Sequence, residues 1–422
     1  MICEIINVGT ELLLGQNFNT NARDIGILLA AAGIDCYRQT SVGDNLDRIV
    51  SAVKETLARA DAVILTGGLG STDDDLTRDA IAEATGRPLV LDPSLESMIR
   101  EKLREFEPKA SDKTIRQAYI PEGARPIKPT LGTAAGFILQ VEGKIIAATP
   151  GVPAEMARML ESDIIPEMKK SAPGASPVIL SRVLKIYGLR EVETERIVHD
   201  LILEQTNPTV APLIAKGAVT LRLTAKGNTR DEARVLISGV EAQVKELLGD
   251  AVFGADAEEM EDAVGALLKK RGLTIALAES ITGGLAASRL INTPGSSTYV
   301  RGGIVAYANS VKTDLLGVAA QTILNHGAVS AQTAEEMASG VKKALGADIG
   351  VSSTGVAGPG GGSPDKPVGL AYFCLATADT LECEHKVFRG TRNEIRFKAS
   401  QYLLNMLRLY LLGRSGRGDE IA

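Results

Sequence analysis

The first 170 residues alternate short apolar runs with segments of helical spacing, and this alternation limits the fold more than any other feature of the chain. Apolar runs cover residues 2–8, 35–41 and 62–65, and helical spacing fills the intervals at 21–32 and 46–59. Repeated βαβ units of this kind predict a largely parallel sheet with helices on both faces. The loops that follow the strands form the ligand edge of such a sheet.

Two changes in the sequence pattern divide the rest of the chain. A stretch with two prolines at 173–177 predicts a linker, and the strand-like and helical runs after it predict a small α+β module. A second linker is expected around 249–256, and αβ alternation then continues to the end. We therefore predict two α/β domains, doubly wound in type, at 1–170 and 254–422, joined through the small α+β module at 171–253.

The composition indicates a cytoplasmic protein. The net charge is −6 at 45% hydrophobic content, and this acidic balance argues against direct nucleic-acid binding. No apolar run reaches about 18 residues and the N-terminus lacks a basic segment, so neither membrane contact nor a signal peptide is expected. Without a C-x-x-C pair, the four cysteines predict buried free thiols. These are Cys3, Cys36, Cys374 and Cys383.

A serine in the last domain has the setting of a nucleophile. Ser280 follows the apolar run 273–278 and precedes two glycines and a helical segment at 285–291. A strand end that meets a helix N-terminus presents a hydroxyl beside backbone N–H groups. The alternative is a capping serine in an ordinary βα turn.

Lys312 is the candidate base for this serine. It falls in the first turn of a predicted helix, where the positive end of the dipole lowers the pKa of an ammonium. A solvated surface lysine is the alternative. With three histidines in the chain, a serine–lysine pair is more economical than a Ser-His-Asp triad, although His326 stays open as the base.

Glycine and arginine residues near the end of the chain predict an anion site. The segment 353–363 follows a strand-like run and is dense enough in glycine for several N–H groups to approach a ligand. It lacks the lysine of a nucleotide-cleaving P-loop. Arg389 and Arg392 could each pair with a phosphate through the planar guanidinium, or could serve only as helix-end charges.

A string of motifs in the last domain resembles the C-terminal domain of the CinA family over nearly all of 258–412: AESITGG, GGIVAYANSVKTDLLGV, HGAVS, STGVAGPGGG and PVGLAYF. The resemblance implies hydrolysis of nicotinamide mononucleotide to nicotinic acid mononucleotide and ammonia, without a cofactor. It implies Ser280 as nucleophile and Lys312 and Tyr307 as proton carriers. It gives Thr354 a catalytic role and Arg392 the substrate phosphate. The other implied substrate-binding residues are Thr282, Gly283, Gly284, Gly355 and Gly358. Ile281 departs from the family, which usually has cysteine there.

The first domain carries its own candidate site. The loop 67–75, GGLGSTDDD, follows a strand and precedes helical spacing. Its glycines suit the approach of a diphosphate, and Asp74 and Asp75 suit a divalent cation. Asp44 and Glu11 lie on neighbouring loops and could complete the oxygen shell. The alternative is a charge cluster at a helix N-terminus.

This half of the chain resembles the N-terminal domain of full-length CinA proteins, which is similar in fold to molybdopterin-binding domains. The motifs are GTELLLGQ, NTNA, VGDN, GGLGSTDDDLT, GTAAGF and PGVPAEM, and the middle module resembles the KH-shaped subdomain of the family, without a glycine-x-x-glycine clamp. The resemblance implies cleavage of ADP-ribose to AMP and ribose 5-phosphate with a divalent metal of the Mg or Co type. The implied substrate-binding residues are Gly67, Gly68, Gly70, Thr72 and Asn21. Ser71 and Ala135 replace prolines usual in the family, so both loops lose a fixed φ angle.

Together these features predict a two-activity, homodimeric enzyme of pyridine-nucleotide recycling that acts on small nucleotides. Two alternatives stay open. The N-terminal domain could bind a nucleotide or a molybdopterin-like ligand without cleaving it. The chain could also be a competence-related adaptor without catalysis, as the family name suggests.

Overall fold

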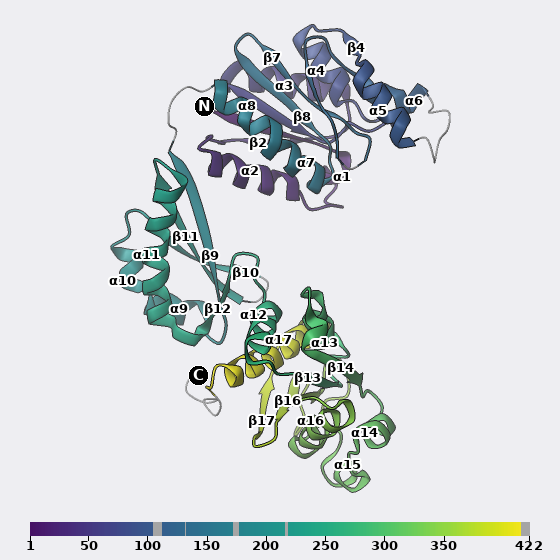
Figure 1. Cartoon of the computed structure of the whole chain (residues 1–422), viewed down its shortest axis with the longest axis vertical. Helices are drawn as coiled ribbons and strands as arrows, with labels where there is room; N and C mark the ends of the chain where they lie inside the picture. The colour runs from purple at the N-terminus through teal and green to yellow at the C-terminus, as the bar shows by residue number, and fades with distance from the viewer. Residues whose placement is uncertain (104–111, 131, 172–176, 216–217, 415–422) are drawn as a thin grey trace. The chain divides into compact units, whose positions relative to one another are not determined.

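The computed structural model describes residues 1–103, 112–130, 132–171, 177–215 and 218–414. Contacts divide the chain into two compact units, one of residues 1–180 with 224–236 and the other of residues 181–223 with 237–422. Most of the predicted linker at 173–177 lies outside the described residues. Three main sheets carry the architecture (Figure 1).

The N-terminal sheet has six strands in the order β2-β1-β3-β8-β7-β6. Its first four strands are parallel, and β7 and β6 are antiparallel additions at one edge. The bounds are β1 Cys3–Val8, β2 Gln39–Val42, β3 Ala62–Thr66, β6 Arg125–Ile127, β7 Gly136–Val141 and β8 Lys144–Thr149. A separate pair joins β4 (Leu89–Leu91) to β5 (Tyr119–Pro121).

Helices cover both faces of this sheet, as the alternation predicts. The helices are α1 Thr10–Leu13, α2 Thr20–Ala32, α3 Leu46–Arg59, α4 Thr77–Thr85, α5 Pro93–Leu103, α6 Asp112–Ile115, α7 Pro153–Met159 and α8 Ile165–Ser171. A 3₁₀ turn spans Arg116–Ala118 and a π turn spans Leu160–Ile164. One core cluster includes Ile49 and Ile81 from α3 and α4, and the other includes Ile25 and Met156 from α2 and α7. Each face of the sheet therefore has its own apolar core.

The middle module is a four-stranded sheet with helices, in the order β10-β11-β9-β12. Its elements are β9 Val178–Ile186, α9 Glu191–Ile197, α10 His199–Leu203, β10 Thr209–Ala215, β11 Ala218–Gly227, α11 Arg230–Leu248 and β12 Val252–Ala255. The linker predicted around 249–256 is wrong, because a 3₁₀ turn at Gly249–Ala251 leads into β12, which pairs antiparallel with β9.

The C-terminal sheet has five strands in the order β14-β13-β15-β16-β17. The first three are parallel, and β16 and β17 continue as an antiparallel pair. Strand bounds are β13 Ile275–Glu279, β14 Val300–Val305, β15 Ile349–Gly355, β16 Leu370–Ala376 and β17 Leu381–Val387. Helix bounds are α12 Met260–Arg271, α13 Leu285–Asn292, α14 Asn309–Leu316, α15 Ala320–His326, α16 Ala331–Leu345 and α17 Arg392–Leu411, with a 3₁₀ turn at Ser296–Thr298.

Helices again lie on both sides of this sheet. Residues of α12, α13 and α17 share one core cluster with alternate residues of the strands, and residues of α14 and α16 share another. The predicted class of two doubly wound α/β domains with a small α+β module is therefore confirmed. Among the described residues, none of the helices has the length and apolar character needed to cross a bilayer.

Candidate active site

Ser280 lies at the end of the central parallel strand of the C-terminal sheet. Its N–H donates to the carbonyl of Ser353 on β15 at 2.8 Å, so the turn begins in register with the sheet. Gly283 and Gly284 follow with φ angles of 61° and 90°. Two successive left-handed residues suit glycine, which has no Cβ to clash. The serine side chain is 9% exposed, at the predicted edge of the sheet.

The Lys312 amine lies within hydrogen-bonding distance of this hydroxyl. Its Nζ is 3.3 Å from Ser280 Oγ, and it also donates to the carbonyls of Ala306 at 2.6 Å and Tyr307 at 3.3 Å. The side chain is 1% exposed. Burial lowers the pKa of Lys312, because a desolvated ammonium loses its hydration. The pKa of Lys312 is therefore lowered, as predicted, but the cause is burial rather than the helix dipole.

The position of Lys312 also separates the two candidate bases. His326 is exposed at the end of α15, and its carbonyl accepts a hydrogen bond from Lys366 at 2.6 Å. Among the described residues, Lys312 supplies the titratable side chain that contacts Ser280 Oγ. The arrangement favours lysine as the base.

Glu279 alters the expected surroundings of the serine. Its carboxylate is 1% exposed and accepts from Ala286 N at 3.1 Å and Ala287 N at 2.7 Å. The N–H groups at the start of α13 are therefore occupied by an internal acid. Within the described part of the chain, no hydrogen bond is donated by the N–H groups of the turn at 282–284. These groups, rather than the helix terminus, are the candidate oxyanion donors.

Two predicted threonines have hydroxyls already engaged within the protein. Thr282 Oγ1 lies 2.7 Å from Ser353 Oγ, and Thr354 Oγ1 donates to the carbonyl of Ala328 at 2.7 Å. Both side chains are buried. Ile281 is 4% exposed and packs toward Gly355. A Cβ added at Gly355 would lie 2.7 Å from Ile281 Cδ1. The residue that departs from the family pattern thus points into the core.

A second group of predicted residues meets around Arg392, the first residue of α17. One guanidinium nitrogen donates to the carbonyl of Gly358 at 2.6 Å, and another donates to Tyr307 Oη at 3.2 Å. Tyr307 is 67% exposed, so this cation lies where a ligand in solvent can reach it. The backbone of Tyr307 holds Lys312 while its ring hydroxyl holds Arg392.

The sequence prediction missed one arginine and left the role of another, Arg389, open. Arg396, one turn further along α17, donates to the carbonyl of Thr282 at 3.1 Å and lies close to Gly283. The spacing of four residues from Arg392 on a helix could have indicated it. Arg389 accepts a hydrogen bond from Lys398 through its carbonyl, and no contact ties its side chain to the group around Arg392 in the described residues.

The N-terminal domain brings its predicted glycines and Asn21 to one edge. The Asn21 amide donates to Thr66 Oγ1 at 3.0 Å and to the carbonyl of Gly151 at 2.9 Å. Gly67 and Gly68 adopt φ angles of 100° and 64° directly after β3. The loops after three parallel strands therefore meet, as expected for a ligand edge. The side-chain oxygen of Asn21 is buried without a hydrogen-bond partner in the described residues.

The four predicted metal ligands do not converge. The Asp75 carboxylate accepts from Gly70 N and Thr72 N, both at 2.8 Å, and from Thr72 Oγ1 at 2.5 Å. Asp44 accepts from Thr10 N at 2.8 Å. A hydrogen bond from Thr72 lowers the pKa of Asp74. Neither these acids nor Glu11 belong to a metal-binding group, since the described residues hold no cluster of three His, Cys, Asp or Glu side chains able to bind one.

These carboxylates therefore do not fit a divalent ion as they stand. Asp75 instead closes its own loop, as a capping carboxylate does. The prediction overlooked Arg78, which holds the same loop. This side chain is 1% exposed and donates to the carbonyls of Leu69 and Gly70, both at 2.7 Å. Burial lowers the pKa of Arg78 to about 10.

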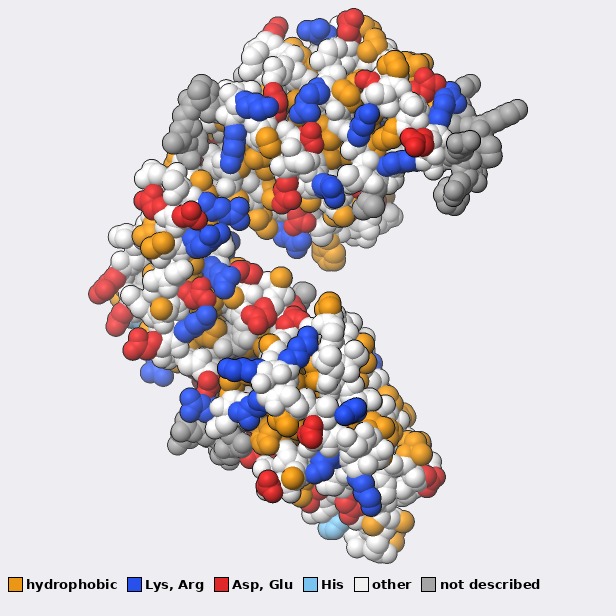
Figure 2. All heavy atoms as spheres, viewed as in Figure 1, with side chains coloured by type: hydrophobic (Ala, Val, Ile, Leu, Met, Phe, Trp, Pro, Cys, Tyr) orange, Lys and Arg blue, Asp and Glu red, His pale blue; other side chains and the backbone are white. Residues whose placement is uncertain are grey.

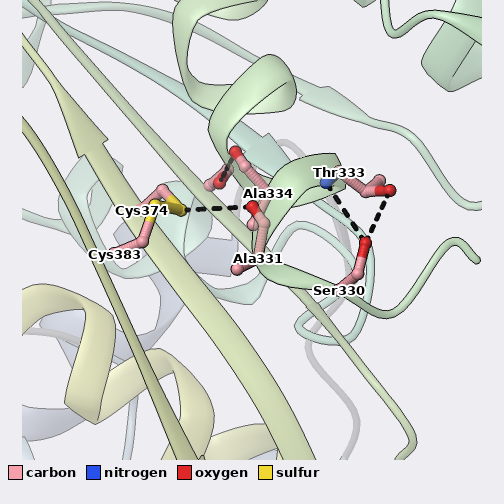
Figure 3. The surroundings of a disulfide bond; sticks show 7 residues. Ser330, Ala331, Thr333, Ala334, Cys374 and Cys383 are labelled. Carbon is pink, nitrogen blue, oxygen red and sulfur yellow. Dashed lines mark hydrogen bonds between the residues drawn. A yellow bond between two sulfur atoms is a disulfide. The ribbon is translucent and has the colours of Figure 1, made fainter. Parts of the chain in front are cut away.

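A disulfide corrects the prediction of four free thiols. Cys374 on β16 lies opposite Cys383 on β17, and their sulfur atoms are bonded (Figure 3). The pair lies beside the first turn of α16, where Ser330 caps the helix. Cys3 and Cys36 are free. The prediction failed because the pairing depends on the register of a hairpin, which no C-x-x-C spacing announces.

Three family models together match most of the chain. A family model described as "CinA C-terminal domain" matches residues 257–411. The model "Probable molybdopterin binding domain" matches 4–170, and "Damage-inducible protein CinA KH domain" matches 181–254. A CinA-like protein of Kosmotoga olearia is 43% identical over 412 residues, 98% of this chain and 99% of its own. A CinA-like protein of Dictyoglomus thermophilum is 43% identical over 98% of this chain and 100% of its own.

Among solved structures, one titled as the protein CinA with unknown function from Thermoplasma acidophilum is 36% identical. The match covers 40% of this chain and 98% of that chain, with a TM-score of 0.37.

Proposed function

This chain belongs to the CinA family, and on that basis we propose that its C-terminal domain hydrolyses a carboxamide through Ser280 and Lys312. One observation carries the proposal: a buried lysine amine with a lowered pKa lies 3.3 Å from a serine hydroxyl at a sheet edge. A neutral amine in such a position is a general base, and an activated serine is a nucleophile for acyl transfer.

The hydrogen bonds of Lys312 define how the proton moves. Two of its donor positions are directed at the carbonyls of Ala306 and Tyr307. In the neutral amine this leaves the lone pair for Ser280, so the hydroxyl proton passes from Oγ to Nζ as Oγ attacks the carboxamide carbon. The tetrahedral oxygen gains its charge near the unpaired N–H groups of the turn at 282–284. The proton on Nζ then leaves with ammonia, and water hydrolyses the acyl-serine ester by the same route.

The exposed position of Arg392 and the family resemblance support a substrate that carries a phosphate. Arg392 is anchored by Gly358 and Tyr307 and stays exposed on its outer side, which suits a phosphate. The family resemblance implies nicotinamide mononucleotide as the substrate. This nucleotide carries a carboxamide at one end and a phosphate at the other. We propose that this nucleotide is converted to nicotinic acid mononucleotide and ammonia.

Ammonia release from nicotinamide mononucleotide tests the proposal. Ser280→Ala and Lys312→Met should each abolish release while the fold persists by circular dichroism. Ser288→Ala and Lys343→Met are matched controls, because both side chains are exposed. Rapid quenching of wild type should trap an acyl group on Ser280 by mass spectrometry. Turnover that persists in Ser280→Ala would exclude the covalent route.

For the N-terminal domain we propose binding of a nucleotide at the edge formed by Gly67, Gly68 and Asn21. The unpaired oxygens of Asn7 and Asn21, both buried, support this proposal because buried acceptors need donors. The resemblance implies ADP-ribose and its cleavage to AMP and ribose 5-phosphate. The carboxylates do not fit a metal as they stand, so binding and cleavage are tested separately. Calorimetry measures the binding of ADP-ribose, and AMP release with added divalent ion measures its cleavage.

The face shown in Figure 2 offers little for an adaptor role on nucleic acid. On the face shown in Figure 2, lysine and arginine side chains are mixed with aspartate and glutamate. Capture of a partner protein by a chain with both sites inactivated would favour the adaptor alternative instead.

A further inference from the structure

Glu155 is a buried acid at the ligand edge of the N-terminal domain. It lies in the first turn of α7, which follows β8 through the short turn at 150–152. Its side chain is 9% exposed. The loop before β7 lies beside this carboxylate. A Cβ added at Gly132 in that loop would lie 2.7 Å from Glu155 Oε1. A side chain at that point would require the carboxylate to move, and the φ of 60° at Gly132 itself favours glycine.

Within the described residues, the carboxylate of Glu155 accepts no hydrogen bond, in contrast to Asp75 and Asp44 at the same edge. Asp75 accepts three hydrogen bonds and Asp44 accepts one from backbone N–H. Among the described residues, no donor reaches the oxygens of Glu155. The nearby Lys102 amine donates instead to the carbonyls of Pro129 and Gly132. Burial raises the pKa of Glu155, and the Lys102 charge opposes that rise only in part.

Asn21 presents a second free acceptor at this edge among the described residues. Asn21 is bonded to the carbonyl of Gly151 through its amide nitrogen and leaves its own oxygen unpaired. Gly151 begins the turn that leads to Glu155, so two unpaired acceptors flank one short segment. The Asn21 oxygen is buried without a donor, while the Glu155 carboxylate keeps slight contact with solvent; a ligand that supplies donors would satisfy both.

A carboxylate at this place can be satisfied by a bound cation or by donor groups of a ligand, such as hydroxyl or amino groups. The described residues hold no cluster of acids that would share a divalent ion with Glu155. Neighbouring hydroxyls on a sugar supply two donors at the spacing of one carboxylate, and acidic residues bind ribose hydroxyls in this way in nucleotide-binding folds. We propose that Glu155 is a specificity-determining residue that accepts hydrogen bonds from a ribose diol of the bound nucleotide.

This inference rests on the proposed nucleotide binding by the N-terminal domain, and calorimetry on the full chain separates the two. ADP-ribose is the probe. Glu155→Gln preserves size and removes the charge, and Glu161→Gln is the matched control because that exposed acid lies further along the same helical run. We expect Glu155→Gln to bind ADP-ribose about 10- to 100-fold more weakly, and the control to bind like wild type.

Deoxy analogues show whether the loss belongs to the hydroxyls. Analogues of ADP-ribose that lack the 2-hydroxyl of one or the other ribose are titrated into wild type and Glu155→Gln. One analogue should bind wild type more weakly and lose nothing further in the variant, which a merely structural role would not produce.

The outcomes are distinguishable. If wild type binds no ADP-ribose, the nucleotide proposal for this domain fails, and the inference fails with it. If wild type binds it and Glu155→Gln binds equally well, only the inference is overturned. The inference is also overturned if the hydroxyl and carboxylate losses add independently. Equal melting temperatures of the three proteins exclude unfolding as the cause.

Discussion

Replacing Lys312 by methionine tests the buried amine directly. The change keeps an unbranched side chain of similar length and removes Nζ with its contacts to Ser280, Ala306 and Tyr307. Loss of a general base costs roughly 10²- to 10⁴-fold in rate, which corresponds to about 3–5 kcal/mol of transition-state stabilisation. We expect kcat for the amide to fall by at least this factor.

The same variant reports the protonation of the lysine through stability. Burial lowers the pKa of Lys312 below its ordinary value of 10.5. Between the lowered pKa and 10.5 the unfolded chain binds a proton that the native chain does not. Native wild type is therefore penalised below this window, and it gains stability relative to Lys312→Met as pH rises through it. The gain has a slope of at most about 1.4 kcal/mol per pH unit. Activity should rise with pH toward the same lowered pKa.

Two assays follow the effect across pH. Ammonia release gives the pH profile of kcat/KM for wild type. Urea unfolding by far-ultraviolet circular dichroism gives the stability difference, since the chain contains no tryptophan. Lys343→Met, which removes an exposed amine, serves as the control. A stability difference that stays flat or falls as pH rises would refute the desolvated amine, and turnover retained by Lys312→Met would refute its role as base.

Three further predictions address neighbouring groups. Glu279→Ala should lower the free energy of unfolding by about 1–2 kcal/mol through loss of the α13 cap, while Glu279→Gln should lose less; urea titration measures both. Arg392→Ala should raise KM for nicotinamide mononucleotide and leave KM for nicotinamide riboside, which lacks the phosphate, unchanged; equal effects on both would contradict phosphate binding. Cys383→Ser should be less stable than oxidised wild type by about 2–4 kcal/mol, and the difference should vanish in reductant.

The fold could be predicted because it depends on local patterns. Each predicted strand run in the first domain begins a βα unit, and the spacing of apolar residues fixes the helical faces. The closeness of Ser280 and Lys312 also follows from this logic, since each residue comes after a neighbouring parallel strand and such ends meet at one edge.

The rest depends on hydrogen bonds and strand register that no residue pattern marks, although the partners lie only seven to nine residues apart. Glu279 occupies the α13 N-terminus because its strand ends seven residues before Ala286, and no motif marks that hydrogen bond. Arg78 holds the glycine loop by donating to the backbone carbonyls of Leu69 and Gly70. Every residue has such a carbonyl, so the sequence does not mark these acceptors. Cys374 meets Cys383 only in one hairpin register. The four predicted metal ligands have the right chemistry, but the carboxylates of Asp44 and Asp75 accept hydrogen bonds from backbone N–H groups instead.

Tyr307 joins the two ends of the C-terminal site, because its carbonyl holds the amine of Lys312 and its phenol holds the guanidinium of Arg392. Under the proposed function, a phosphate that draws the guanidinium toward itself would also displace the residue whose carbonyl contacts Lys312. We therefore expect a substrate that lacks the phosphate to react more slowly even at saturation.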